Sequence, residues 1–361
     1  MQLVDAHLDL AMNALVLNRD LTKRAHDTRA DEAGMTEKGR AAGTVGLPDL
    51  RQAEIGLCLA TVLARVNPEG TSPLDFRTHE IAHAHAQGEL ALYRELERQG
   101  RMRMVTSREG LTRHVEMLSG LPGGPLPDDT PLGYVLLMEG ADPIVAPDRV
   151  EGWWRDGLRV VGLAHYGSSA YAFGTDSAGP LTEKGRALVA EMDRLGMILD
   201  ASHLTDESFH DALDRFHGPV LSSHSNCRAL VPGDRQLDDE MIKRLAERGA
   251  VIGAVCDAWM LEPGWVRGES TPENVTVANV VDHIDHVCQV TGTSRHAAIG
   301  SDLDGGYGTE QTPKDLDTIA DLQQIPELLI ARDYSDDDIA GIMHGNWIRF
   351  LGDHLPSEPQ A

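Results

Sequence analysis

A histidine and an aspartate stand two residues apart near the start of the chain, at His7 and Asp9. They interrupt a short apolar run, residues 4–10, that is typical of a β-strand. Because alternate side chains of a strand face the same way, we expect both to project to one face. Ala6 and Leu8 would then face the opposite way. An imidazole beside a carboxylate forms half of a metal site, although two solvated or mutually bonded polar residues would show the same pattern.

Residues able to bind metals also end later strand-like segments. In chain order they are Glu139, His165, His203, His224 and the pair Asp302 and Asp304. When parallel strands form a barrel, their carboxyl ends meet at one mouth, where reacting groups gather. A hydrogen bond to nearby backbone would explain any one of these residues. Burying so many ionisable groups without a cation would be costly, so the pattern predicts a metal centre.

The segments that must position these residues alternate between strand and helix. Eight apolar segments indicate strands, at residues 4–10, 55–66, 133–139, 159–165, 197–203, 219–225, 250–257 and 296–304. Apolar strands separated by helices predict a parallel sheet that helices cover. Eight such units fit a closed (β/α)8 TIM-type barrel, as one domain over residues 1–352 with a frayed tail over 353–361. A ninth strand at 102–106 would require a different barrel.

Helical periodicity fills most of the intervals between these strands. It predicts helices at 73–100, from 108, at 150–156, 182–195, from 206, and at 238–248, 275–291, 316–332 and 335–351. Residues 19–50 are polar and show no sustained period, so we expect a long excursion over one rim of the barrel. Together with residues 257–272, this excursion would form the walls of a pocket.

Charge and composition exclude several classes of function. The formal net charge is −25, which argues against nucleic acid and anionic membranes as partners. No apolar run is long enough to cross a bilayer, and no secretory signal is recognisable. Four cysteines lie far apart without paired spacing, which favours buried free thiols over disulfides. These features predict a cytoplasmic protein.

Several segments, taken together, match a known family. They are residues 5–9 (DAHLD), 138–140 (MEG), 200–203 (DASH), 223–226 (SHSN), 281–286 (VDHIDH), 300–305 (GSDLDG) and 345–349 (GNWIR). On these segments the chain resembles the membrane (renal) dipeptidase family, which comprises zinc dipeptidases with amidohydrolase-like barrels. The resemblance runs in the same order from residue 3 to about residue 352. It implies the fold predicted above and a homodimer.

The resemblance also implies two Zn²⁺ ions, although other divalent metals would suit the same ligands. His7 and Asp9 would bind one ion. His203 and His224 would bind the second, and Glu139 would bridge the pair. Two such ions can share a hydroxide, lower its pKa and direct it at a carbonyl carbon.

Three further residues acquire roles from the resemblance. His165 would polarise the carbonyl of the substrate, and Arg235 would hold the carboxylate of the substrate. Asp302 would be the general acid and base, with Asp304 as the second choice. His283, on a predicted helix, matches a structural position of the family.

Arg235 has an alternative explanation, a surface ion pair with Asp234 or Asp238. A planar guanidinium nevertheless suits bidentate capture of a carboxylate. The sequence departs from the family around His165, at residues 163–169 (LAHYGSS), and by having Pro232 and Gly233 shortly before Arg235.

Three functions are compatible with these residues. The first is a binuclear zinc dipeptidase that hydrolyses dipeptides with a free C-terminal carboxylate through a metal-bridging hydroxide. The second is a related metal hydrolase for N-acyl amino acids, lactones or cyclic amides. The third is a barrel without catalytic activity that binds ligands or serves assembly, and it predicts an incomplete set of ligands.

Overall fold

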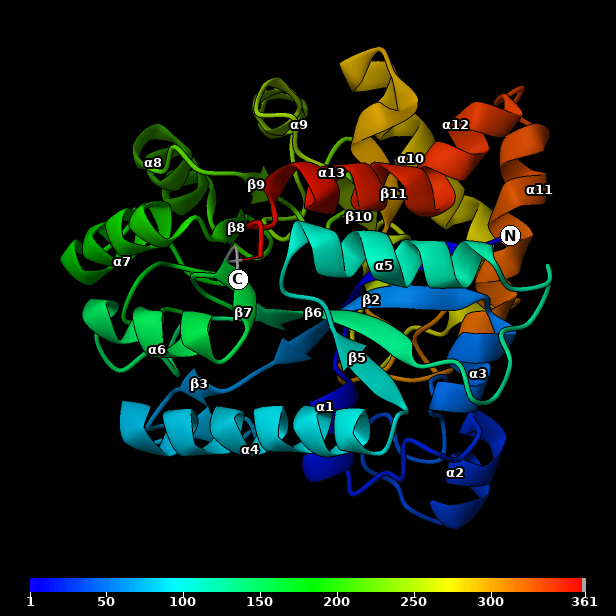
Figure 1. Cartoon of the computed structure of the whole chain (residues 1–361), viewed down its shortest axis with the longest axis horizontal. Coiled ribbons are helices and arrows are strands. Elements are labelled where there is room, and N and C mark those ends of the chain that lie inside the picture. Colours follow the sequence, from blue (N-terminus) through cyan, green and yellow to red (C-terminus); the bar gives the residue numbers. More distant parts are fainter. Residues whose placement is uncertain (359–361) are drawn as a thin grey trace.

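The structure, a computed structural model, describes residues 1–358 and contains the eight expected parallel strands (Figure 1). They are β1 (Leu3–Leu8), β2 (Ile55–Val62), β6 (Leu132–Met138), β7 (Leu158–Gly162), β8 (Ile198–Asp200), β9 (Val220–Leu221), β10 (Ile252–Ala254) and β11 (Ala297–Ile299). One sheet runs in the order β1-β2-β6-β7-β8-β9, and β10 pairs with β11. A parallel bridge between Ser222 and Ile252 joins the two sheets, and β11 lies against β1. The predicted (β/α)8 fold class is confirmed.

Where β11 meets β1, hydrogen bonds to side chains replace the backbone hydrogen bonds that join neighbouring strands elsewhere. Ser301 N donates to Asp5 Oδ1 at 2.9 Å. The carbonyls of Ala297 and Ile299 accept hydrogen bonds from the side chains of Asn346 and Trp347, at 2.9 and 3.0 Å. Buried backbone groups need such partners. The start of helix α13 (Asn346–His354) therefore completes the barrel at this gap.

The ninth candidate strand belongs to the sheet but does not enlarge the barrel. It is β5 (Met102–Met104), which pairs with residues 132–134 of β6. β7 pairs with residues 136–138 of β6, while β2 pairs with β6 along residues 133–138. β5 and β7 therefore pair with successive parts of the same edge of β6.

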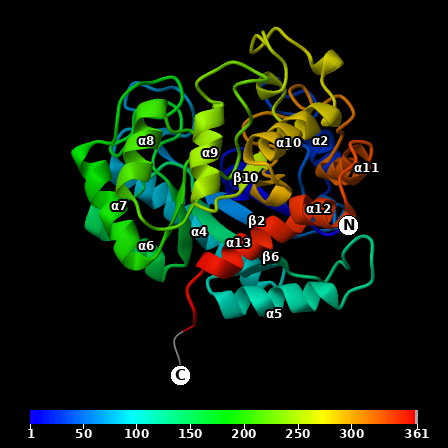
Figure 2. The same cartoon turned by 90° about the horizontal axis from the view of Figure 1, so that it is seen from above.

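Helices surround the strands, as Figure 2 shows from above. Those at predicted positions are α4 (His79–Arg98), α5 (Arg108–Ser119), α6 (Val150–Arg155), α7 (Glu183–Leu195), α8 (Asp206–Arg215), α9 (Asp239–Glu247) and α10 (Val277–Thr291). The segment 316–332 divides into a 3₁₀ helix, η5 (Ile319–Gln324), and α11 (Ile325–Ile330). The segment 335–351 divides into α12 (Asp336–Ala340), the π-helix η6 (Gly341–Gly345) and α13. No helix of the described residues combines the length and apolarity needed to span a membrane.

Some expected boundaries are wrong. The strand expected at 55–66 ends at Val62, and a small separate sheet of β3 (Arg65–Val66) and β4 (Asp75–Phe76) follows it. α4 begins only after Thr78, whose hydroxyl caps it. Three helices near the N-terminus were not expected: α1 (Leu10–Leu15), α2 (Ala25–Asp31) and α3 (Leu47–Gln52). Each is too short for helical periodicity to stand out.

Alternate residues of each strand of the barrel belong to two different apolar clusters, one outside the barrel and one inside it. Leu136 and Met138 pack in the outer cluster with residues of the surrounding helices. Val135 and Leu137 pack in the inner cluster with Trp347 and other residues of α13. Glu139 continues the parity of the inner positions, so its carboxylate points into the barrel.

A bulge in β1 changes the alternation that the sequence suggested. Ala6 packs in the inner cluster with Val4, whereas Leu8 packs in the outer one, so the expectation for Ala6 is wrong. The pairing register with β2 shifts between Asp5 and Leu8. A bulge places an extra residue in one strand and re-aims the following side chains. His7 therefore follows Ala6 on the inner side.

The tail expected at 353–361 lies partly outside the described residues. Within them, α13 continues to His354 and Leu355 is buried. The backbone N–H of Glu358 donates to Glu109 of α5 at 2.8 Å. All four cysteines are buried and unpaired, as predicted.

Candidate metal centre

The predicted site residues follow their strands at short, regular distances. Glu139 comes directly after β6. Each of four others lies three residues beyond the end of a strand: His165 after β7, His203 after β8, His224 after β9 and Asp302 after β11. His203 and Asp302 have left-handed backbones, with φ of 66° and 57°. Residues other than glycine rarely adopt this conformation, and those that do cluster at functional sites.

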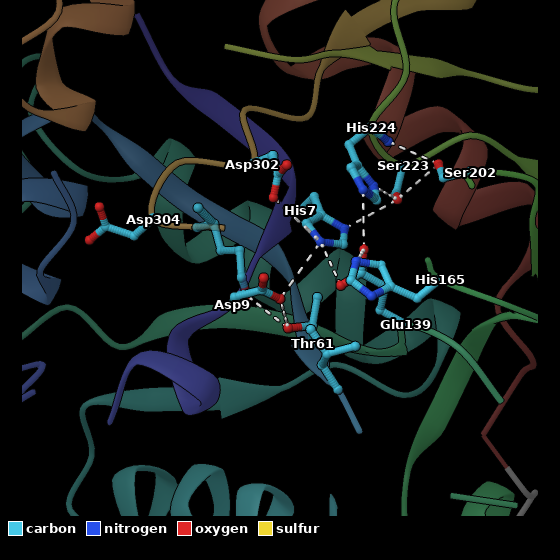
Figure 3. A network of polar contacts seen from close by, with 12 residues as sticks. His7, Asp9, Thr61, Glu139, His165, Ser202, Ser223, His224, Asp302 and Asp304 are labelled. Atoms are coloured by element: carbon cyan, nitrogen blue, oxygen red, sulfur yellow. Dashed lines mark hydrogen bonds and ion pairs between the residues drawn. The ribbon is translucent and has the colours of Figure 1, made fainter. Parts of the chain in front are cut away.

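Two groups of metal-binding side chains meet at Glu139 (Figure 3). In the first, His7 Nε2 lies 3.5 Å from Glu139 Oε2 and 3.7 Å from Asp9 Oδ1. In the second, Glu139 Oε1 lies 3.1 Å from His203 Nε2 and 3.2 Å from His224 Nε2. The structure thus brings together all five residues that the sequence suggested as ligands, with Glu139 between the two pairs.

A buried serine orients two of these imidazoles. Ser223 Oγ donates its single proton to Asp200 Oδ2 at 2.5 Å. His224 Nδ1, at 2.7 Å from Ser223 Oγ, must therefore be the donor, and the same holds for His7 Nδ1 at 3.3 Å. In their neutral form, both imidazoles then keep the lone pair on Nε2, the atom that faces Glu139. Such partners orient metal-binding histidines.

The charges of the cluster fit cations. Burial alone would lower the pKa of His7, but Glu139, Asp9 and Asp302 raise it to about 10. Burial and the charge of Glu139 raise the pKa of Asp9 to about 7. His7 Nε2 and Glu139 Oε2 are buried without a hydrogen-bond partner among the described residues. Bound cations would balance the carboxylates and occupy these unpartnered atoms, so the residues fit the two predicted metal ions.

His165 and Asp302 stand at the edge of the cluster and line the cavity above it, which has a volume of about 400 Å³. His165 Nε2 lies 3.7 Å from Glu139 Oε1, and burial lowers the pKa of His165 to about 4. Asp302 Oδ1 lies 3.9 Å from His7 Nε2, and burial raises the pKa of Asp302 well above its usual value. A Cβ at Gly305 would lie 2.0 Å from Asp302 Oδ1, so glycine is needed there.

Asp304, the second choice for acid and base, is engaged elsewhere. Its Oδ1 accepts hydrogen bonds from Thr44, and its Oδ2 accepts them from Val45 N and the Arg19 guanidinium. Figure 3 shows its carboxylate turned away from His7. Asp304 anchors the segment 19–50 to the barrel.

Arg235 lines the same cavity and is 3% exposed. It donates to His224 O at 2.7 Å and to Ser225 Oγ at 3.2 Å. The alternative of a surface ion pair is wrong, because Asp234 accepts instead from Asp176 N and Asp238 caps α9. In the described residues 1–358, no carboxylate forms an ion pair with this guanidinium.

The walls of the cavity come from both segments that the sequence suggested. The segment 19–50 contributes Lys38, and the segment 257–272 contributes Asp257, Trp259 and Arg267. Sequence reasoning did not single out these side chains, nor Ser223. Of these, only Ser223 had a signal, since it lies within the quoted segment 223–226.

The membrane dipeptidase family (peptidase family M19) matches residues 1–355 of this chain. The chain belongs to this family. Dipeptidase tcpJ of Claviceps purpurea is 35% identical over 204 residues, which are 55% of this chain and 45% of that protein. The chain spans about half the length of the curated relatives it matches. The resemblance stated from the sequence is confirmed.

Solved structures of this metallopeptidase family share the fold over nearly the whole chain. Dipeptidase AC aligns with a TM-score of 0.77 and 23% identity, over 99% of both chains. A metallopeptidase from Rhodobacter sphaeroides, bound to a phosphinate mimic of the dipeptide L-Ala-D-Ala, aligns with a TM-score of 0.76 and 22% identity. The alignment covers 98% of this chain and 99% of that one. The barrel of this chain is therefore the fold of the family.

Proposed function

We propose that this protein is a binuclear zinc dipeptidase that hydrolyses dipeptides with a free C-terminal carboxylate. The observation that carries the proposal is the pair of ligand groups sharing Glu139, with Arg235 in the wall of the same cavity. Membership of the membrane dipeptidase family supports it, as does the dipeptide mimic bound by the Rhodobacter sphaeroides structure. The site of this chain would take the same class of substrate.

His7, Asp9 and Glu139 would hold one zinc ion. His203, His224 and the second oxygen of Glu139 would hold the other. When bound, the ions supply a Lewis acid and an activated water molecule. Asp200 and Ser223 keep the ring nitrogens of His7 and His224 available for this task.

The remaining residues have separate tasks in hydrolysis. Asp302 takes a proton from the attacking water and returns it to the leaving amine, as a general base and then a general acid. Its high pKa suits the protonated step. His165 is neutral at pH 7, so an N–H at Nε2 can donate to the carbonyl oxygen as negative charge develops there.

Arg235 binds the substrate. Two of its nitrogens hold Ser225 and the backbone of His224, which fixes the guanidinium in the wall of the cavity. With no ion-pair partner among the described residues, its charge is available to the C-terminal carboxylate of a dipeptide. This residue distinguishes a dipeptidase from a hydrolase of lactones or cyclic amides, whose substrates lack that carboxylate.

The test is to load the purified protein with zinc, determine the metal content per chain and screen dipeptides of both stereochemistries. We expect two ions per chain and hydrolysis of dipeptides. Arg235→Ala should raise KM for dipeptides at least tenfold while leaving the metal content unchanged. A chain that holds no divalent metal and cleaves no dipeptide would refute the proposal. Hydrolysis that is insensitive to Arg235→Ala would favour lactones or cyclic amides as substrates. The cytoplasmic location and the homodimer stay predictions from the sequence.

A further inference from the structure

The cavity above the metal centre holds more positive charge than a single carboxylate needs. The cationic side chains that line it are Lys38, Arg65, Arg235 and Arg267. They gather there although the net charge of the chain is −25. Arg65 pairs with Asp75 at 2.8 Å. Within residues 1–358, neither Lys38 nor Arg267 forms an ion pair.

Aromatic rings hold Arg267 in place. Its guanidinium carbon lies 4.0 Å from the centre of the Trp259 ring and 5.3 Å from that of the Tyr166 ring. One of its nitrogens donates to the Tyr166 hydroxyl at 2.8 Å. Stacking restrains a guanidinium while its remaining N–H groups stay free for an acceptor. Arg267 is therefore a preorganised anion-binding group.

Tyr166 connects Arg267 to residues of the metal centre. Its ring lies 4.9 Å from the His165 ring and 5.2 Å from the His203 ring. Burial raises the pKa of Tyr166 to about 12, while the charges of Arg267 and Arg235 act to lower it. Arg267 is thus held beside the metal centre, in the wall of the cavity that Arg235 also lines.

One acid of the cavity wall is already bound by other donors. Asp257 lines the cavity, but its carboxylate accepts hydrogen bonds from Gln311 Nε2 at 2.7 Å and from Trp259 N at 3.1 Å. Burial raises the pKa of Asp257 to about 6. Asp9 and Glu139 would be engaged by the metals, and Asp302, which also lines the cavity, would serve as the acid and base.

We infer that Arg267 recognises an acidic side chain on the C-terminal residue of the substrate, which makes dipeptides ending in aspartate or glutamate the preferred class. This inference rests on the proposed dipeptidase function. Arg235 would take the main-chain carboxylate and Arg267 the side-chain carboxylate, so a two-carboxylate residue would bridge the two guanidiniums.

The test compares dipeptides with the same N-terminal residue that end in Asp or in its isosteric amide Asn, using the zinc-loaded enzyme. We expect kcat/KM to favour the Asp substrate about tenfold, equivalent to about 1.4 kcal/mol, chiefly through KM. Arg267→Gln should bring the ratio to about one. Arg98→Gln, which removes an exposed charge on α4 outside the cavity, should leave the ratio unchanged.

Each alternative gives a different result. Equal cleavage of both substrates by the wild type would leave the dipeptidase standing and overturn the preference. An equal loss on both substrates in Arg267→Gln would show that Arg267 only supports its loop. A ratio abolished by Lys38→Gln but kept in Arg267→Gln would move recognition to Lys38 and overturn the assignment. No cleavage of any dipeptide would instead refute the proposed function.

Discussion

Ser223 Oγ lies 2.7 Å from His224 Nδ1, and this contact fixes which nitrogen of the imidazole carries its proton. The proton of Ser223 is committed to Asp200, so the hydroxyl can only accept from the ring. The same oxygen lies 3.3 Å from His7 Nδ1. One hydroxyl therefore prepares a histidine in each of the two ligand groups.

Removing that hydroxyl should weaken metal binding without removing a ligand. We expect Ser223→Ala to lower zinc affinity by about 10- to 100-fold, since loss of a partner of a metal-binding histidine has effects of that size. Competition with a chelator of known affinity measures this. Ser119→Ala, which removes an exposed hydroxyl on α5, is the control and should change nothing. Equal affinities in wild type and Ser223→Ala would contradict the role of the serine.

Substitutions of the two aspartates after β11 should have different effects, one on catalysis and the other on stability. Asp302→Asn should lower kcat by about 10²- to 10⁴-fold, because it removes the proposed acid and base. Asp304→Asn should instead cost about 1–3 kcal/mol of unfolding free energy, because an amide nitrogen in place of Oδ2 cannot accept the buried hydrogen bonds from Arg19 and Val45 N. Steady-state kinetics and urea denaturation of both variants measure these effects. The reverse outcome would assign the acid and base role to Asp304.

Removing the metals should destabilise the fold as well as stop catalysis. Without cations, burial of the carboxylates of Asp9 and Asp302 and repulsion from Glu139 raise the pKa of both aspartates. We expect a chelator to lower Tm, and zinc at about 100 times its Kd to restore about 2.7 kcal/mol. Calorimetry with and without chelator measures the change. Glu139→Gln, which weakens the bridge, should show much less recovery with zinc.

The meeting of the strand-end residues could be predicted from the sequence because each strand has a local pattern. The sequence shows where each apolar segment ends, and parallel strands bring those ends together. Glu139 and His203 were found in this way, although their segments lie far apart in the chain. The bulge in β1 could not be predicted, because it depends on the pairing of Asp5 and Leu8 with β2.

Other parts of the site depend on contacts that the sequence does not record. Arg267 and Trp259 lie in a segment without periodicity, and only the folded chain stacks them. Asp304 shares a segment with Asp302, and only its contacts with Arg19, Thr44 and Val45 in the folded chain indicate a structural role. The pairing of β5 with β6 likewise follows from space left beside β7, not from the composition of β5.

His283 should make the fold sensitive to acid. It was expected to be structural, and its Nδ1 accepts a hydrogen bond from Cys227 N at 3.0 Å. Burial lowers its pKa from 6.5 to about 3. Below pH 6.5 the unfolded state binds a proton at His283 that the folded state does not bind. The contribution of His283 to the free energy of unfolding is therefore complete above pH 6.5. It decreases as the pH falls toward 3, by about 1.4 kcal/mol per pH unit.

His283→Asn should keep an acceptor near Cys227 N but lose this titration. We expect the stability advantage of the wild type over the variant to shrink by about 2 kcal/mol between pH 6.5 and pH 5. Urea denaturation of both proteins at several pH values measures this, with chelator present so that loss of metal at low pH does not contribute. The control is His286→Asn. His286 is a partly exposed histidine that lies on α10 with His283 and contacts Asp239 of α9. Parallel pH profiles of wild type and His283→Asn would show that His283 is not the titrating group.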